Sequence, residues 1–121
     1  MYRLNSLLND AEEITANLLT SNPDKDSVTA IFAAWDEPAI GAAKALAEAG
    51  RDEVIVTGVD GNEQAVQMIK DGSCLKATVK QNFEGMADIV CRQMEKYYAG
   101  ETIEKGEMYA PAELITQENA Q

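Results

Sequence analysis

The sequence predicts an α/β fold in which parallel strands alternate with helices along a single domain. Short apolar runs, each too short for a helix and bounded by turn residues, recur along the 121-residue chain. Segments with helical periodicity lie between these runs, and no repeat, linker or low-complexity stretch interrupts the pattern. Strands and helices that alternate in this way form βαβ units. We therefore expect a parallel sheet with helices on both faces.

The first predicted element is a helix over Ala11–Leu19. Asp10, with Glu13 three residues later, matches a capping box, in which each side chain satisfies a free backbone N–H. The turn Asn22–Asp24 ends this helix. The apolar run Val28–Ala33 that follows is predicted to be a buried strand.

The second predicted helix covers Glu37–Ala49 and is rich in alanine, so it can lie close to a sheet. Asp36 is predicted to be its N-cap, with Pro38 in the first turn, where a missing N–H does no harm. Gly50 is predicted to end the helix in the left-handed conformation that glycine tolerates. The second strand is predicted over Val54–Val59.

The remaining predicted elements are two helices on either side of a third strand. A helix over Glu63–Lys70 precedes the strand Leu75–Val79, and a long helix over Phe83–Tyr98 follows it and stops at Gly100. Apolar side chains recur at helical spacing along the long helix, and they form a stripe made of Phe83, Met86, Val90, Met94 and Tyr97.

The composition excludes several classes of function. The formal net charge of −11, from 21 acidic and 10 basic side chains, argues against partners such as nucleic acids and anionic membranes. The absence of histidine removes histidine-based triads, bases and zinc sites. The two cysteines, Cys74 and Cys91, are too few for a thiolate metal cage, and we expect both to be packed as small hydrophobes. Because no nucleophile has an identifiable base, we expect no enzyme activity, no cofactor and no metal.

Hydrogen-bonding side chains follow all three predicted strands. The first strand leads to Trp35 and Asp36, the second to Asp60, and the third to Gln81. Ligands of open α/β sheets bind beyond the carboxyl ends of the strands, so these positions mark the expected site. A carboxylate on Asp60, an amide on Gln81 and the flat ring of Trp35 suit a polyhydroxylated ligand.

Each of these positions also has a purely structural interpretation. Asp36 can serve as an N-cap whether or not a ligand binds. Asp60 before a glycine is also favourable turn chemistry, and Trp35 can be a core residue. Gln81, together with the next residue, can simply cap the last helix.

Three segments are distinctive: the run Ala30–Ala42, which contains Ala-Trp-Asp-Glu-Pro-Ala, the run Val56–Gly61 and the run Ala77–Gln81. Together they resemble the ribose/galactose-type periplasmic sugar-binding proteins of ABC importers. The segments Leu18–Asp24 and Glu113–Asn119 are also similar to that family. The similarity covers nearly the whole chain, in order and at the spacing of the family.

Members of this family have two lobes and more than twice this length, so the resemblance implies that residues 1–121 form a single α/β domain, part of a C-terminal lobe. It implies a Rossmann-like half of a type I binding protein, whose helix at 83–100 normally packs with the first lobe. Asp60 matches a carboxylate that clasps sugar hydroxyls, and Gln81 matches an amide at the hinge. Trp35 departs from the family, which commonly has a sugar-contacting asparagine there.

The leading hypothesis is therefore a solute-binding component that closes over a monosaccharide-like ligand and delivers it to an ABC permease. The parent protein is expected to be periplasmic or otherwise extracytoplasmic, although the start of this chain carries no export signal. The alternatives are the effector-sensing domain of a LacI-type repressor and an α/β domain without a ligand. Without the first lobe, the helix Phe83–Tyr98 is expected either to self-associate or to fold back on its own sheet.

Overall fold

The structure, a computed structural model, describes residues 4–120 in two compact units. The first unit comprises the chain up to Lys80 together with the segment from Leu114, and the second comprises Gln81–Glu113. The elements up to Lys80 are α1 (Leu4–Ser21), the 3-10 helix η1 (Lys25–Ser27), β1 (Ala30–Phe32), α2 (Asp36–Glu48), β2 (Ile55–Thr57), α3 (Glu63–Lys70) and β3 (Leu75–Lys80). They are followed by α4 (Phe83–Tyr98) and β4 (Glu113–Thr116).

The sheet confirms the predicted α/β class. Its strand order is β1-β2-β3-β4, and both the β1–β2 and the β2–β3 pairs are parallel. Ile31 of β1 lies opposite Val56 of β2, and Thr57 of β2 lies opposite Ala77 of β3 after a shift in register. The first two strands are shorter than predicted. Strand β4 was not predicted, because its apolar run consists of Leu114 and Ile115 alone.

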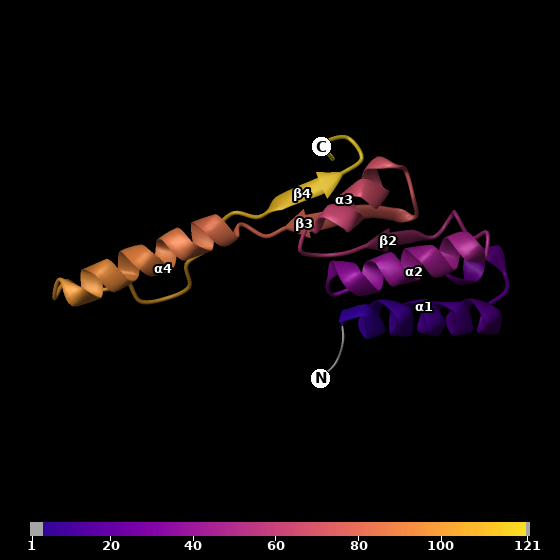
Figure 1. The fold of residues 1–121 in the computed structure, drawn as a ribbon, viewed down its shortest axis with the longest axis horizontal. Helices are drawn as coiled ribbons and strands as arrows, with labels where there is room; N and C mark the ends of the chain where they lie inside the picture. Colours follow the sequence, from indigo (N-terminus) through magenta and orange to yellow (C-terminus); the bar gives the residue numbers. More distant parts are fainter. Residues whose placement is uncertain (1–3, 121) are drawn as a thin grey trace. The chain divides into compact units, whose positions relative to one another are not determined.

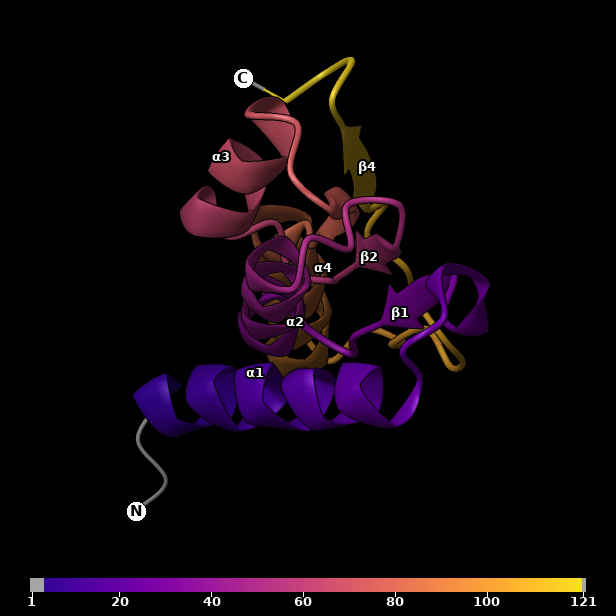
Figure 2. The ribbon, with the colours of Figure 1, turned by 90° about the vertical axis from the view of Figure 1, so that its right-hand side faces the viewer.

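The core of the first unit lies between the sheet and helices α2 and α3. Figure 2 shows these two helices on the same side of β1 and β2. The largest apolar side chains that are fully buried come from these helices, from β2 with the residue before it, and from β3: Ile40, Leu46, Val54, Val56, Ile69 and Leu75. Closely packed apolar side chains of this kind supply most of the stability of a small domain.

The expected helices on both faces are found on one face only within the described part of the first unit. Phe32 is 73% exposed and Ile55 is 47% exposed, and both alternate along their strands with residues that face the helices. The first strand is therefore half-exposed rather than buried. Its apolar run did not distinguish the two cases, because side chains on both faces of β1 are hydrophobic.

Helix α1 is much longer at its start than the sequence predicted. It already includes Leu4, so the exposed Asp10 lies inside the helix and does not form a capping box at its start. Helix α1 packs against α2 (Figure 1), and this tertiary contact extends the helix beyond the local capping signal. Helix α2 begins at Asp36 and ends before Gly50, which has the predicted left-handed φ of 65°.

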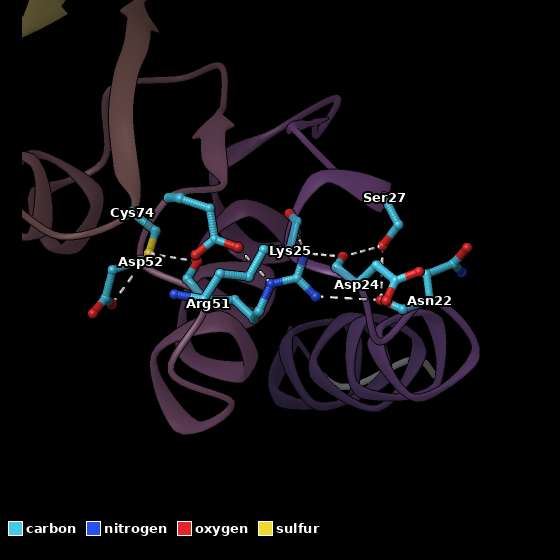
Figure 3. Close-up of polar contacts among 8 residues, drawn as sticks. Asn22, Asp24, Lys25, Ser27, Arg51, Asp52 and Cys74 are labelled. Carbon is cyan, nitrogen blue, oxygen red and sulfur yellow. Dashed lines mark hydrogen bonds and ion pairs between the residues drawn. The ribbon is translucent and has the colours of Figure 1, made fainter.

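Arg51 stabilises the opposite edge of the sheet from the predicted site, where the strands begin. Its guanidinium donates to the backbone carbonyls of Asn22 (3.3 Å), Asp24 (3.2 Å) and Lys25 (2.8 Å), and it pairs with the carboxylate of Glu53 at 2.6 Å. Figure 3 shows this side chain reaching from the loop before β2 to the turn before β1. The cluster therefore fixes a turn with a largely buried cation whose donors are satisfied.

The second unit consists of α4 and the segment that follows it. Helix α4 has its predicted bounds, and Asn82 caps it by accepting a hydrogen bond from the Gly85 N–H at 2.8 Å. Its predicted apolar stripe is exposed, with Val90 at 56% and Met94 at 50%. Cys91 is also exposed, so the expectation that it is packed in a core is wrong, whereas Cys74 is buried as predicted. Among residues 4–120, no helix is long and apolar enough to cross a membrane.

Candidate ligand-binding site

Trp35 lies between the end of β1 and the start of α2. Its backbone is extended, with φ −153° and ψ 175°, as the residue before a helix requires. The residue is 38% exposed, so the interpretation of Trp35 as a core residue is wrong. An exposed indole next to a strand end is available to cover the apolar face of a ligand.

Asp36 does not act as the N-cap that the sequence predicted. It is the first residue of α2, fully buried, and its carboxylate accepts hydrogen bonds from two other segments. The Thr78 hydroxyl of β3 donates to Oδ1 at 2.7 Å, and the Asn62 N–H donates to Oδ2 at 2.8 Å. Burial raises the pKa of the Asp36 carboxyl, and the hydrogen bonds from Thr78 and Asn62 oppose the rise. The nearby Asp60 charge adds a smaller rise.

Asp60 begins the turn between β2 and α3 in an unusual backbone conformation. Its φ of 119° is the only positive value at a non-glycine residue among those the structure describes. The Asp60 N–H donates to the Val79 carbonyl at 2.9 Å, and the residue forms a parallel bridge with Lys80. Two residues later, Asn62 caps α3 by accepting from the Ala65 N–H at 2.8 Å. The turn interpretation of Asp60 is thus correct, and it leaves a ligand role open.

The fold brings Trp35 and Asp60 to the same edge of the sheet. The hydrogen bond from the Asn62 N–H to Asp36 joins the loop after β1 to the loop after β2. Trp35 precedes Asp36 in the first loop, and Asp60 lies two residues before Asn62 in the second. Gln81 is the first residue of the second unit, so its placement beside the other two stays a prediction.

The hydrogen bond from Thr78 to Asp36 was not predicted from the sequence. A threonine within a strand has no local signal for a polar partner, because the carboxylate that it binds lies 42 positions earlier in the chain. This contact could be expected only if the position of β3 relative to the start of α2 were known. Among residues 4–120, no group of three or more histidine, cysteine, aspartate or glutamate side chains could hold a metal ion.

Comparison with known proteins identifies the family to which this geometry belongs. The sequence profile described as "periplasmic binding protein domain" matches residues 2–102. The chain belongs to the periplasmic binding protein family. The ribose import binding protein of Bacillus subtilis is 36% identical over 104 residues, which cover 86% of this chain and 32% of that protein.

Two solved structures in this family have closely similar folds. An ABC transporter solute binding protein from Agrobacterium vitis with bound allitol has a TM-score of 0.85 and 33% identity, covering 93% of this chain and 39% of its own. A periplasmic solute binding protein from Actinobacillus succinogenes with bound D-allose has a TM-score of 0.80 and 30% identity. The match covers 93% of this chain and 38% of that protein.

This periplasmic binding protein chain therefore spans between about a third and two fifths of the length of these relatives. The predicted family and the predicted α/β fold class are confirmed. The comparisons give no support to the LacI-type repressor alternative. The relatives are named for binding and import of solutes, and none of these names describes an enzyme.

Proposed function

We propose that this chain forms one wall of the sugar site in the solute-binding component of an ABC importer. The observation that carries the proposal is the placement of an exposed Trp35 ring and the Asp60 carboxylate at neighbouring strand ends, joined by the Asp36–Asn62 hydrogen bond. Relatives at 30–36% identity with bound allitol or D-allose, or named for ribose import, support a polyhydroxylated ligand of this size.

Each of three side chains has a role in this proposal. The Asp60 carboxylate accepts hydrogen bonds from two neighbouring hydroxyls of the sugar. The Trp35 indole covers the C–H face of the ring, and the Gln81 amide both donates to and accepts from the ligand. These contacts bind and orient a monosaccharide-like molecule without any reacting group, so the function is binding and not catalysis.

The complete site needs a second wall. In this proposal a first lobe packs with the helix at 83–100 and closes over the ligand. The closed protein then delivers the sugar to a permease from the periplasmic side. Closure is a hinge motion that the ligand favours because the closed form buries its hydroxyls against paired groups. The 121-residue chain alone should therefore bind sugars weakly or not at all, since one wall of hydrogen bonds is missing.

Calorimetry on the two-lobed protein that contains this chain tests the assignment with D-ribose and D-allose as probes. Asp60→Ala should reduce affinity by at least about a hundredfold, because buried sugar hydroxyls then lack a charged acceptor. Trp35→Ala should cost less and change the ratio between the two sugars. Asp10→Ala, which removes an exposed carboxylate of α1, is the matched control and should bind like wild type. If Asp60→Ala binds a sugar with the same affinity as the wild type, the proposed role of Asp60 in sugar binding is wrong.

A further inference from the structure

We propose that Asp36 and Thr78 are positioning residues that hold the backbone of residues 60–62, and with it the Asp60 carboxylate, in one conformation. They are not themselves in contact with the ligand in this proposal. The consequence for sugar binding rests on the function proposed above, whereas the effect on the loop does not depend on any ligand.

The loop needs an external constraint because Asp60 is strained. A φ of 119° brings the Cβ of a non-glycine residue close to its own backbone, so a free loop would leave this conformation. Conformations of this kind persist only where several surrounding contacts each favour them. Strained residues of this kind are common at ligand-binding sites. The sequence analysis predicted that Asp60 lies at such a site.

Three successive backbone N–H groups supply that constraint. The Asp60 N–H donates to the Val79 carbonyl at 2.9 Å, which continues the pairing of β2 with β3. The Gly61 N–H donates to the Thr78 hydroxyl oxygen at 3.2 Å, and the Asn62 N–H donates to Asp36 Oδ2 at 2.8 Å. Two of the three bonds therefore end on side chains and not on the sheet, so they can be removed singly by substitution.

The two side chains form one connected unit. The Thr78 hydroxyl accepts from Gly61 and donates to Asp36 Oδ1 at 2.7 Å, so the carboxylate fixes the direction of the hydroxyl proton and leaves its lone pairs for the loop. Asp36 and Thr78 are both fully buried, where hydrogen bonds are stronger than in water and an unpaired partner is costly.

Gly58 shows how closely this unit is packed. A Cβ at that position would overlap Asp36 Oδ1 and lie 3.1 Å from the Ala39 Cβ. The carboxylate therefore occupies space that only a glycine at position 58 leaves open. A buried carboxylate costs stability unless it is fully hydrogen-bonded, and here its hydrogen bonds are made to the loop that carries Asp60 and to the Thr78 hydroxyl that also holds that loop.

Amide hydrogen exchange on the 121-residue chain tests the effect on the loop. Thr78→Val keeps the shape of the side chain and removes the hydroxyl, so the Gly61 and Asn62 amides should exchange about tenfold faster relative to the Val56 amide within the sheet. Thr78→Ser keeps the hydroxyl and should return both amides to within about twofold of wild type. Thr15→Val makes the same change at another buried threonine, in α1, and should leave this ratio unchanged.

Asp36→Asn gives a second route if Thr78→Val does not fold. The amide has nearly the same shape, yet its single oxygen can accept from the Thr78 hydroxyl or from the Asn62 N–H but not from both. The Gly61 and Asn62 amides should therefore again exchange faster than the Val56 amide. Wild-type exchange at Gly61 and Asn62 in a folded Thr78→Val or Asp36→Asn chain overturns the proposal. Acceleration that matches that of Val56 also overturns it, because it would reflect global unfolding alone.

Sugar affinity in the two-lobed protein tests the consequence for binding. Thr78→Val should weaken D-ribose or D-allose binding by about tenfold, whereas Thr15→Val should bind like wild type at matched stability. A Thr78→Val protein with a mobile loop and unchanged affinity overturns the positioning role. If the wild type binds neither sugar, the proposed function fails for these sugars, and the exchange measurement still decides whether Asp36 and Thr78 hold the loop.

Discussion

Gly41 of α2 lies directly against the backbone carbonyl oxygen of Leu8 in α1. A Cβ at Gly41 would overlap that oxygen and would lie 3.1 Å from the Glu12 nitrogen and 3.2 Å from the Ala11 Cβ. The two helices can approach this closely only because one residue has no side chain. This contact sets the distance of α1 from the helix that covers the sheet.

Gly41→Ala is therefore expected to destabilise the chain by about 1–3 kcal/mol, as overpacking does in other cores. Chemical denaturation measures this change. Ala47→Gly, at an exposed position of the same helix, is the control for helix propensity and should cost about 1 kcal/mol. If the contact with Leu8 were unimportant, Gly41→Ala would stabilise the chain by a similar amount, since alanine favours helices.

Replacing Asp60 by glycine should harm stability less than replacing it by alanine. Both substitutions remove the carboxylate, but only glycine adopts a φ of 119° without strain. The Asp60→Gly chain is expected to be more stable than Asp60→Ala by roughly 1–2 kcal/mol. Thermal or urea unfolding of the two variants gives this difference directly, and equal stabilities would show that position 60 relaxes in the alanine variant.

The stability of the chain should depend on pH through Asp36. Its pKa is raised above the ordinary value of 3.8, so just above that value the folded state holds a proton that the unfolded state has released. The contribution of Asp36 is thus fully present below its unfolded pKa and is lost as the pH rises through the folded pKa. Asp36→Asn removes this titration.

As the pH rises from about 3 to about 6, the free energy of unfolding of the wild type should therefore fall relative to that of Asp36→Asn. Asp10→Asn, on the exposed surface of α1, is the control for the loss of one carboxylate. A difference between wild type and Asp36→Asn that grows in favour of wild type over this range contradicts the assignment.

The exposed stripe on α4 should cause the 121-residue chain to self-associate. Val90 and Met94 are half exposed or more, and Tyr97 is 67% exposed, so the stripe offers apolar surface that a partner can cover. Light scattering should report a mass that rises with concentration, and Val90→Glu should reduce it. Gln64→Glu on α3 adds the same charge elsewhere and is the control. A wild-type chain that stays monomeric at all concentrations contradicts this expectation.

The two cysteines should react at different rates with a thiol reagent. Cys91 is exposed on α4, whereas Cys74 is buried and its pKa is raised, chiefly by burial and then by the charge of Asp52. Cys91 is therefore expected to react rapidly in the folded protein, whereas Cys74 should react only as the chain unfolds. Labelling of the Cys91→Ala and Cys74→Ala variants separates the two rates, and rapid reaction of Cys74 in the native state would contradict its burial.

Local patterns in the sequence were sufficient for the α/β class and for most of the elements. The bounds of α3 and α4 and the left-handed Gly50 were predicted correctly, because capping residues and glycines act within a few positions of the chain. The strand ends that carry Trp35 and Asp60 were also predicted, since parallel strands direct their carboxyl ends to one edge.

Only the tertiary structure decided the roles of residues whose partners are distant in the chain. Asp36 was predicted to cap its own helix, yet its carboxylate binds the Asn62 N–H and the Thr78 hydroxyl from two later segments. The length of α1 and the open face of β1 likewise depend on which surfaces other elements cover. A hydrophobic period or a capping residue specifies local geometry, whereas a buried polar group takes whichever partner the packed fold brings within hydrogen-bonding distance.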